Sequence, residues 1–391
     1  MAKSLTKLWL GGLKRLLAVQ TEYAEAVAKK RKPMRPARPK PVAKPSAKVR
    51  TPSARAKAPP AAHESRVRPR AAAWAGGAWT RSFHSAPAAA GRLINHLQYG
   101  LYIPAGHALA HMPLVVMLHG CEQSIDGFAE GTRMNLLADR FGFAVVYPEQ
   151  SKHAHAHRCW HWYDASDHAG GGEMRAVVSL ADALVAEHEF DGERVYVAGL
   201  SAGAGLASLL AVRYPQHFAA VALHSGPALG EAHSGIAGMD VMRRGTHHDP
   251  VDLIDQAVDV ATYPGMPAII LQGDADRVVA PVNADQLALQ FARLNGLVDA
   301  QGRPQAGEVR EDRKAGVLTR DYLRGGRRVI RLCHVTGLSH AWSGGDDAVP
   351  FHSSKGPDAS ALIWEFFKHQ RRVGAASEFD GAGALPAAAR G

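Results

Sequence analysis

Short apolar runs rich in β-branched residues alternate with helix-like patterns over about residues 95–370. In two segments, 173–187 and 202–213, apolar residues recur at the three- and four-residue spacing of a helix. Six apolar runs have the length and composition of buried strands: PLVVMLHG (113–120), FAVVYPE (143–149), RVYVAG (194–199), AAVALHSG (219–226), PAIILQG (267–273) and RRVIRLCHV (327–335). Strands that alternate with helices predict an α/β fold, with a mostly parallel sheet covered by helices on both faces.

The two ends of the chain show different patterns. Residues 1–28 predict a basic amphipathic helix, because leucines and a tryptophan recur at helical spacing between lysines and arginines. Packing on its own domain and adsorption to a membrane or polymer surface are both open for this helix. Residues 29–75 are rich in Pro, Ala and Lys and predict a disordered linker. A folded domain is expected over 90–370, and residues 371–391 predict a flexible Gly/Ala-rich tail.

Charge is distributed unevenly along the chain. Of the net +10, residues 1–75 hold 19 Lys/Arg against three Glu, so the remainder carries a net −6. Such a basic segment favours weak, salt-dependent contact with a polymer granule, an anionic surface or a polyanion. No nucleic-acid recognition fold accompanies it, so no specific nucleic-acid partner is expected.

Membrane and export signals are also weak. No apolar run reaches the roughly 18 residues that span a bilayer, so no transmembrane segment is predicted. Lysines and an arginine interrupt the apolar N-terminal patch, and no small-residue cleavage site follows it. This N-terminus therefore does not resemble a secretory signal. Three cysteines allow at most one disulfide and leave at least one thiol unpaired.

One serine lies at a junction between a predicted strand and a predicted helix. In VAGLSAGAG, Ser201 follows the run 194–199 and has a glycine two residues away on either side. A turn this tight strains the serine backbone, and small neighbours avoid a clash. The pattern is typical of a nucleophile elbow, at the carboxyl end of a strand where parallel sheets carry their chemistry. A purely structural turn serine is the alternative.

A serine nucleophile needs a base, and the base needs an acid that orients it. In folds with a nucleophile elbow the acid and then the histidine follow the serine along the chain. Asp274 and Asp276 both follow a predicted strand, and Asp276 is favoured because it precedes the apolar segment VVAP. His340, in a Gly/Ser-rich loop after the last strand, is the candidate base. His334 lies inside that strand and is expected to pack there.

Ester hydrolysis also requires donors for the developing oxyanion. The backbone N–H of Ala202 directly follows the serine, at the positive end of the predicted helix. The second expected donor is the N–H of Cys121 in LHGCEQS, where Gly120 lets the backbone turn inward.

Five motifs taken in order resemble those of poly(3-hydroxybutyrate) (PHB) depolymerase-type esterases, which are related to feruloyl and acetylxylan esterases. The motifs are LHGCEQS, CWHWYD, VAGLSAGAGLASLLAVRYPQHFAAVALHSG, QGDADRVVAP and GLSHAWSGG. The resemblance covers about residues 90–370. It implies an α/β-hydrolase fold and a catalytic triad of Ser201, Asp276 and His340, with Cys121 at the oxyanion loop.

The resemblance also implies a function. A carboxylic ester hydrolase that uses no cofactor and no metal is expected, acting on 3-hydroxybutyrate oligomers or similar short-chain esters. Feruloyl or acetylxylan esterase activity is the alternative, and a granule- or polyanion-binding protein with a scaffold domain is the non-enzyme alternative. Many members are secreted, and depolymerases of solid polymer add a polymer-binding domain. This chain shows neither a signal nor such a domain, so soluble esters are the expected substrates. An extracellular location, as is common in the family, and a cytoplasmic, granule-associated location both stay open.

Several aromatic residues and histidines are candidates for substrate contact. The motif CWHWYD contains two tryptophans, Trp160 and Trp162, that could line a substrate pocket or pack in the core. Because they alternate along the chain, one is expected in the pocket and the other in the core. His224 and Trp342 are further substrate-binding candidates. A disulfide from Cys159 to Cys121 would join this loop to the oxyanion loop, and both the bridged and the free forms stay open.

Two remaining segments are assigned less directly. The histidines of HAHAHRCWH suggest a metal site, but no carboxylate completes a ligand set and a serine triad needs no metal, so a solvated loop is favoured. They are His153, His155, His157 and His161. Residues 227–262 are a candidate cap over the site, in which Met239 and Met242 would line the pocket or simply pack.

Overall fold

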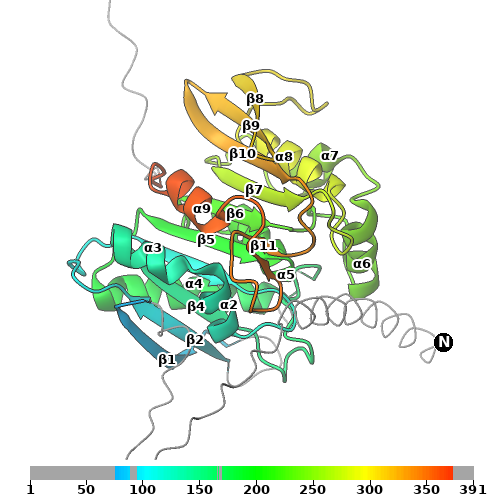
Figure 1. Ribbon diagram of the computed structural model, residues 1–391. Coiled ribbons are helices and arrows are strands. Elements are labelled where there is room, and N and C mark those ends of the chain that lie inside the picture. The colour runs from blue at the N-terminus through cyan, green and yellow to red at the C-terminus, as the bar shows by residue number, and fades with distance from the viewer. Residues whose placement is uncertain (1–74, 89–94, 165, 167–169, 373–391) are drawn as a thin grey trace, which may run out of the picture. The chain divides into compact units, whose positions relative to one another are not determined.

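Six parallel strands form the centre of the sheet in the computed structural model, which describes residues 75–88, 95–164, 166 and 170–372 (Figure 1). In their order across the sheet they are β4 (Ala144–Glu149), β3 (Leu114–Leu118), β5 (Val195–Leu200), β6 (Ala220–His224), β7 (Ala268–Gly273) and β10 (Arg327–Val335). Each pair of neighbours runs parallel. These strands correspond to the six apolar runs of the sequence, so the prediction of a mostly parallel α/β sheet is confirmed.

Antiparallel strands extend the sheet at both edges. Strands β2 (His96–Ile103) and β1 (Ala78–Ser85) follow β4, and β9 (Val317–Arg324) and β8 (Glu308–Lys314) follow β10. The sequence pattern missed these four strands. Strand β1 buries little apolar surface and β8 is exposed along its whole length, whereas β2 buries Leu97, Leu101 and Tyr102. Strand β1 also begins before residue 90, so the folded domain is longer at its N-terminal end than predicted.

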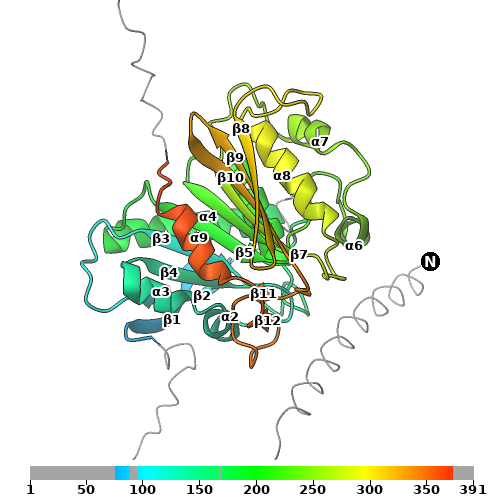
Figure 2. The same cartoon turned by 45° about the horizontal axis from the view of Figure 1, so that its top comes forward.

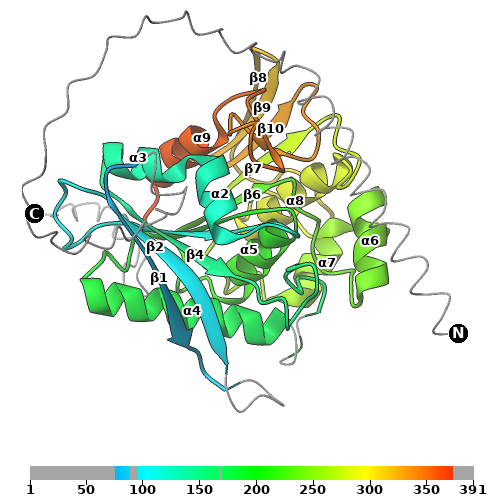
Figure 3. The same cartoon turned by 60° about the horizontal axis from the view of Figure 1, so that its bottom comes forward.

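Helices cover both faces of the sheet (Figure 2). One face carries α2 (Ile125–Thr132), α3 (Met134–Phe141) and α9 (Ala359–Phe367), and the other carries α4 (Gly170–His188), α5 (Ala202–Arg213) and α8 (Val282–Leu294). Figure 3 shows α3 and α9 on one side of the strands and α4 on the other. Helices α6 (Gly235–Arg244) and α7 (Pro250–Ala257) pack on α8. They occupy the segment 227–262 that was a candidate cap.

Two hydrophobic cores explain why the central strands are apolar without interruption. Val116 and Leu118 of β3 belong to the core that includes α4, α5 and α8, whereas Val115 and Met117 belong to the core beneath α2, α3 and α9. Successive side chains of a strand point to opposite faces, so a strand covered on both faces needs apolar residues at every position.

Some predicted segments lie outside the described residues. They are the basic helix over 1–28, nearly all of the linker over 29–75 and nearly all of the tail over 371–391. Within the described ranges, no helix is long and apolar enough to cross a membrane.

Candidate active site

Ser201 occupies the turn between β5 and α5 and has φ 57° and ψ −121°. This conformation is costly for a residue with a Cβ atom. A Cβ atom on Gly199 would collide with the backbone of Gly203, and one on Gly203 would collide with the carbonyl oxygen of Leu118. Glycine is therefore sterically required two residues before and after the serine, and the turn has the form that the sequence predicted. The Ser201 residue is 7% exposed.

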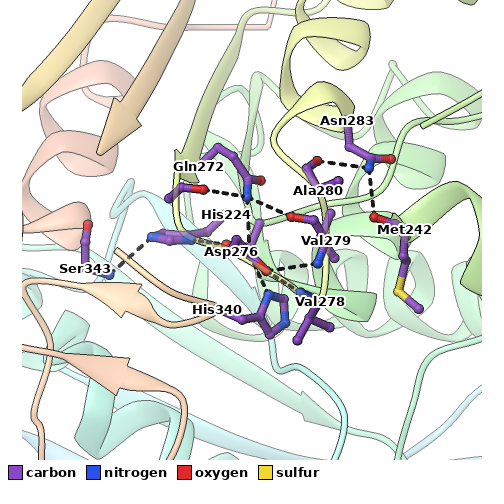
Figure 4. A network of polar contacts seen from close by, with 12 residues as sticks. His224, Met242, Gln272, Asp276, Val278, Val279, Ala280, Asn283, His340 and Ser343 are labelled. Carbon is purple, nitrogen blue, oxygen red and sulfur yellow. Dashed lines mark hydrogen bonds and ion pairs between the residues drawn. The ribbon is translucent and has the colours of Figure 1, made fainter. Parts of the chain in front are cut away.

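His340 and Asp276 are in direct contact. The Nδ1 atom of His340 lies 2.7 Å from Oδ2 of Asp276, and because an ionised carboxylate only accepts hydrogen bonds, Nδ1 is the donor (Figure 4). The aspartate side chain is fully buried and the histidine side chain is 8% exposed. Nδ1 therefore carries a proton, which leaves Nε2 as the ring nitrogen that can act as a base.

Backbone and side-chain donors surround the Asp276 carboxylate. Its Oδ1 atom accepts hydrogen bonds from the N–H groups of Val278 at 2.8 Å and Val279 at 2.9 Å. Burial alone would raise the pKa of Asp276, but the neighbouring His340 and these two donors outweigh it and hold that pKa below its usual value. The carboxylate therefore stays ionised opposite the imidazole.

Gln272 is a further partner that the sequence analysis did not single out. It is fully buried at the end of β7, and its Nε2 atom lies 3.2 Å from Asp276 Oδ2 and 3.0 Å from the carbonyl oxygen of Val279. The only signal in the sequence is a polar residue that ends an apolar strand. Gln272 supplies the fourth donor to the carboxylate and so fixes its orientation.

Asp274, the other candidate acid, faces a different part of the structure. Its Oδ1 atom accepts a 2.6 Å hydrogen bond from the N–H of Gly337, and its own N–H donates to the carbonyl oxygen of Val335. Asp274 thus holds the start of the loop that carries His340, whereas Asp276 contacts the imidazole itself. The geometry favours Asp276 as the orienting acid.

Sheet order brings the three residues to one edge. Ser201 follows β5, Asp276 follows β7 and His340 follows β10, and these strands lie in the order β5, β6, β7, β10. All four run parallel, so their carboxyl ends share one edge of the sheet.

The loop after β3 lies against the nucleophile turn. A Cβ atom on Gly120 would come within 3.4 Å of the Ser201 Cβ, and the Gly120 N–H donates to Oε1 of Gln123 at 2.7 Å. Among the described residues, none accepts a hydrogen bond from the N–H of Cys121. The N–H of Ala202, in the first turn of α5, has no acceptor within its helix. Both groups are available to an oxyanion.

A disulfide joins the oxyanion loop to the aromatic loop. Cys121 and Cys159 are bonded, with their Cα atoms 4.3 Å apart, and Cys333 is a free, buried thiol. The question that the sequence left open is thereby decided in favour of the bridge.

Removing this disulfide is expected to destabilise the protein. The cysteines are 38 residues apart, and closing a loop of that length in the unfolded chain corresponds to about 4 kcal/mol of unfolding free energy. Denaturant unfolding of a Cys121→Ser/Cys159→Ser variant measures this loss, and Cys333→Ala is the control for a cysteine outside the bridge. A double variant as stable as the parent would contradict the expectation.

The two tryptophans of the aromatic loop are both buried, and the prediction that one lines the pocket and the other the core stays a prediction. Trp160 is 1% exposed, and its Nε1–H donates to the carbonyl oxygen of His119 at 3.0 Å. Trp162 is 6% exposed and packs against Gly205 of α5, where a Cβ atom would overlap the indole. Their surroundings favour a structural role for both.

The other two substrate-binding candidates are also enclosed. His224 and Trp342 are fully buried and stack on each other, with ring centroids 5.1 Å apart. The indole N–H of Trp342 donates to Oγ of Ser360 at 3.1 Å. Their positions give no support to direct contact with a substrate.

The histidine-rich loop is paired with carboxylates from distant parts of the chain. His157 Nδ1 contacts Oε1 of Glu122, and His161 Nδ1 lies 2.6 Å from Glu173 Oε1. Both carboxylates lie outside the histidine-rich segment, and the sequence pattern gave no indication of either contact. Within the part of the chain that the structure describes, no group of three or more such side chains is arranged to hold a metal ion.

Acid is expected to destabilise the fold through three buried histidines. Burial lowers the pKa of His119 to about 4, of His224 to about 3 and of His352 to about 4. Below pH 6.5 the unfolded chain binds protons at these rings that the folded chain does not, so stability falls as pH falls. The slope should approach about 4 kcal/mol per pH unit near pH 5. Urea unfolding between pH 7 and 5 measures it, and a His352→Gln variant should show a slope about one third smaller. Constant stability over this range would contradict the expectation.

Comparison with known proteins supports one family. Residues 97–315 match the family model described as esterase PHB depolymerase. Poly(3-hydroxyalkanoate) depolymerase C of Paucimonas lemoignei is 32% identical over 206 residues, which are 52% of this chain and 49% of that protein. The chain thus matches about half the length of that relative. Feruloyl esterase B of Neurospora crassa is 30% identical over 213 residues, covering 50% of this chain and 69% of that protein.

A solved structure supports the fold. The acetyl xylan esterase from Aspergillus awamori superimposes with a TM-score of 0.57 at 19% identity, covering 74% of this chain and 99% of that one. The predicted α/β-hydrolase fold is confirmed. With the family model matching more than half of its length, the chain belongs to the esterase PHB depolymerase family.

Proposed function

We propose that the protein is a serine carboxylic ester hydrolase in which Ser201 is the nucleophile, His340 the general base and Asp276 the acid that orients it. The observation that carries this proposal is the buried 2.7 Å contact between His340 and Asp276, at the sheet edge where Ser201 occupies a strained turn. A strained serine and a carboxylate-bound imidazole at one edge are the components that acyl transfer requires.

The reaction follows from the roles of these groups. Ser201 Oγ attacks the ester carbonyl while Nε2 of His340 takes its proton, and Asp276 stabilises the imidazolium that forms. The negative charge on the former carbonyl oxygen is stabilised by the N–H groups of Cys121 and Ala202. The imidazolium then protonates the leaving alcohol and leaves an acyl-enzyme. Water, activated by the same imidazole, attacks the acyl-enzyme and releases the acid.

The proposed substrates are 3-hydroxybutyrate oligomers or similar short-chain esters. The match to a poly(3-hydroxyalkanoate) depolymerase supports this choice. The match to a feruloyl esterase makes aromatic or acetyl sugar esters the alternative.

Initial rates of the full-length protein on four substrates test the proposal. They are p-nitrophenyl butyrate, 3-hydroxybutyrate trimer, methyl ferulate and acetylated xylo-oligosaccharide. We expect kcat/KM for the trimer to exceed the values for the last two by about tenfold or more. A preference for the ferulate or the acetyl sugar would favour the alternative. A protein that hydrolyses none of them, and whose Ser201 is not labelled by a fluorophosphonate, would contradict the proposal.

A further inference from the structure

His224 connects the nucleophile turn to the loop that carries His340. It is the last residue of β6, the strand between β5 and β7 in the sheet. Its carbonyl oxygen accepts a 2.9 Å hydrogen bond from the N–H of Ser201. Its ring nitrogen Nε2 accepts a 3.2 Å hydrogen bond from the N–H of Ser343, three residues after His340 (Figure 4). One residue thus contacts both halves of the candidate machinery.

The surroundings of the ring suit it to accept a hydrogen bond. Its other nitrogen, Nδ1, lies 3.2 Å from Oγ of Ser225, and its face stacks on Trp342 at an interplanar angle of 23°. Burial lowers the pKa of His224 to about 3, with a smaller contribution from the nearby His340, so the ring is neutral at physiological pH. A neutral ring has one acceptor nitrogen, and a backbone N–H can only donate, so that acceptor is Nε2.

The His340 loop is held by side chains on both sides of the histidine. Asp274 accepts from the N–H of Gly337 before His340, and His224 accepts from the N–H of Ser343 after it. Both contacts are hydrogen bonds to backbone groups, so they fix the path of the loop rather than one rotamer. Small displacements matter at such a site, because an error of about 1 Å in the position of a reacting group can cost about 100-fold in rate.

We propose that His224 is a positioning residue that keeps the His340 loop in register with the nucleophile turn. This inference rests on the proposed function for its effect on catalysis, while the contact itself can be measured separately. In this role His224 acts on two backbone segments and not on the reacting atoms.

Two substitutions separate the acceptor from the ring. His224→Phe keeps a planar ring against Trp342 and removes the acceptor, whereas His224→Gln can place an amide oxygen near the position of Nε2. We expect His224→Phe to lower kcat about 10- to 100-fold with KM changed less than about threefold. In the same variant, hydrogen exchange of the Ser343 amide should become at least about tenfold faster. His224→Gln should restore most of both quantities. The proposal would be overturned if the two variants had equal kcat values and the Ser343 amide of His224→Phe exchanged as slowly as in the parent protein.

A measurement on the unaltered protein covers the case in which His224→Phe does not fold. ¹⁵N NMR of the full chain with labelled histidine should show Nε2 of His224 as the unprotonated nitrogen at pH 7. A proton on Nε2 would overturn the proposal, because that nitrogen could not then accept from Ser343. The exchange and NMR results test the hydrogen bond between Ser343 and His224 even if the protein hydrolyses no ester. Absence of hydrolysis would count against the proposed function alone.

Discussion

Replacing Ser201 by alanine is expected to lower kcat for ester hydrolysis by about 10⁵- to 10⁶-fold, because no other group can form the acyl-enzyme. Some residual rate should remain, since the oxyanion donors and the binding surface are left in place. Burst and steady-state kinetics with p-nitrophenyl butyrate measure both effects, because the acyl-enzyme burst should disappear together with turnover.

Ser208→Ala is the matched control for this variant. Ser208 is a buried serine in α5, the helix that follows the nucleophile turn. Its Oγ donates to the carbonyl oxygen of Ala204 at 2.9 Å. Ser208→Ala also deletes a serine Oγ, but at a position seven residues after Ser201. The hydrolysis rate should therefore change little, while the free energy of unfolding falls by about 1 kcal/mol. If Ser201→Ala retained more than a few per cent of the parent activity, Ser201 would not be the nucleophile.

Replacing Asp276 by asparagine should produce the second largest loss, about 10⁴-fold in kcat. The carboxylate accepts from four donors: His340, Gln272 and the N–H groups of Val278 and Val279. An asparagine amide has only one acceptor oxygen, so its NH₂ group would face some of these donors. It would also favour the wrong tautomer of the His340 ring.

The control for this variant is the other candidate acid. In Asp274→Asn the amide oxygen can still accept from the N–H of Gly337, so a loss of less than about tenfold is expected. Steady-state kinetics of the two asparagine variants at pH 8, with near-ultraviolet circular dichroism to confirm folding, makes the comparison. A larger loss from Asp274→Asn than from Asp276→Asn would reverse the assignment of the acid.

Both the fold and the nucleophile turn were predictable from local sequence, for a physical reason. The six central strands are covered on both faces, and this requirement leaves unbroken apolar runs such as PLVVMLHG. Around Ser201, the backbone of Gly203 lies so close to Gly199, and that of Leu118 so close to Gly203, that only glycine fits at both positions. Each constraint restricts which residue types a short segment can hold, and it is therefore visible in that segment. The edge strands β1 and β8 bury too little apolar surface to leave such a pattern.

Contacts between distant segments were not predictable in the same way. Asp274 and Asp276 follow the same strand, and only the folded path of the loop directs one to Gly337 and the other to His340. His161 contacts the carboxylate of Glu173, which lies outside the histidine-rich segment.

Local sequence patterns were enough to predict the parallel core, the strained turn at Ser201 and the candidate residues of a triad. The contact of Asp276 with His340, the pairing of Cys121 with Cys159 and the hydrogen bond from Ser343 to His224 emerged only from the folded chain. The reason is that burial on both faces and close backbone packing limit the residue types of a short segment and so leave a local pattern. Hydrogen-bond partners are instead selected by the order of strands in the sheet, which brings residues more than a hundred positions apart into contact.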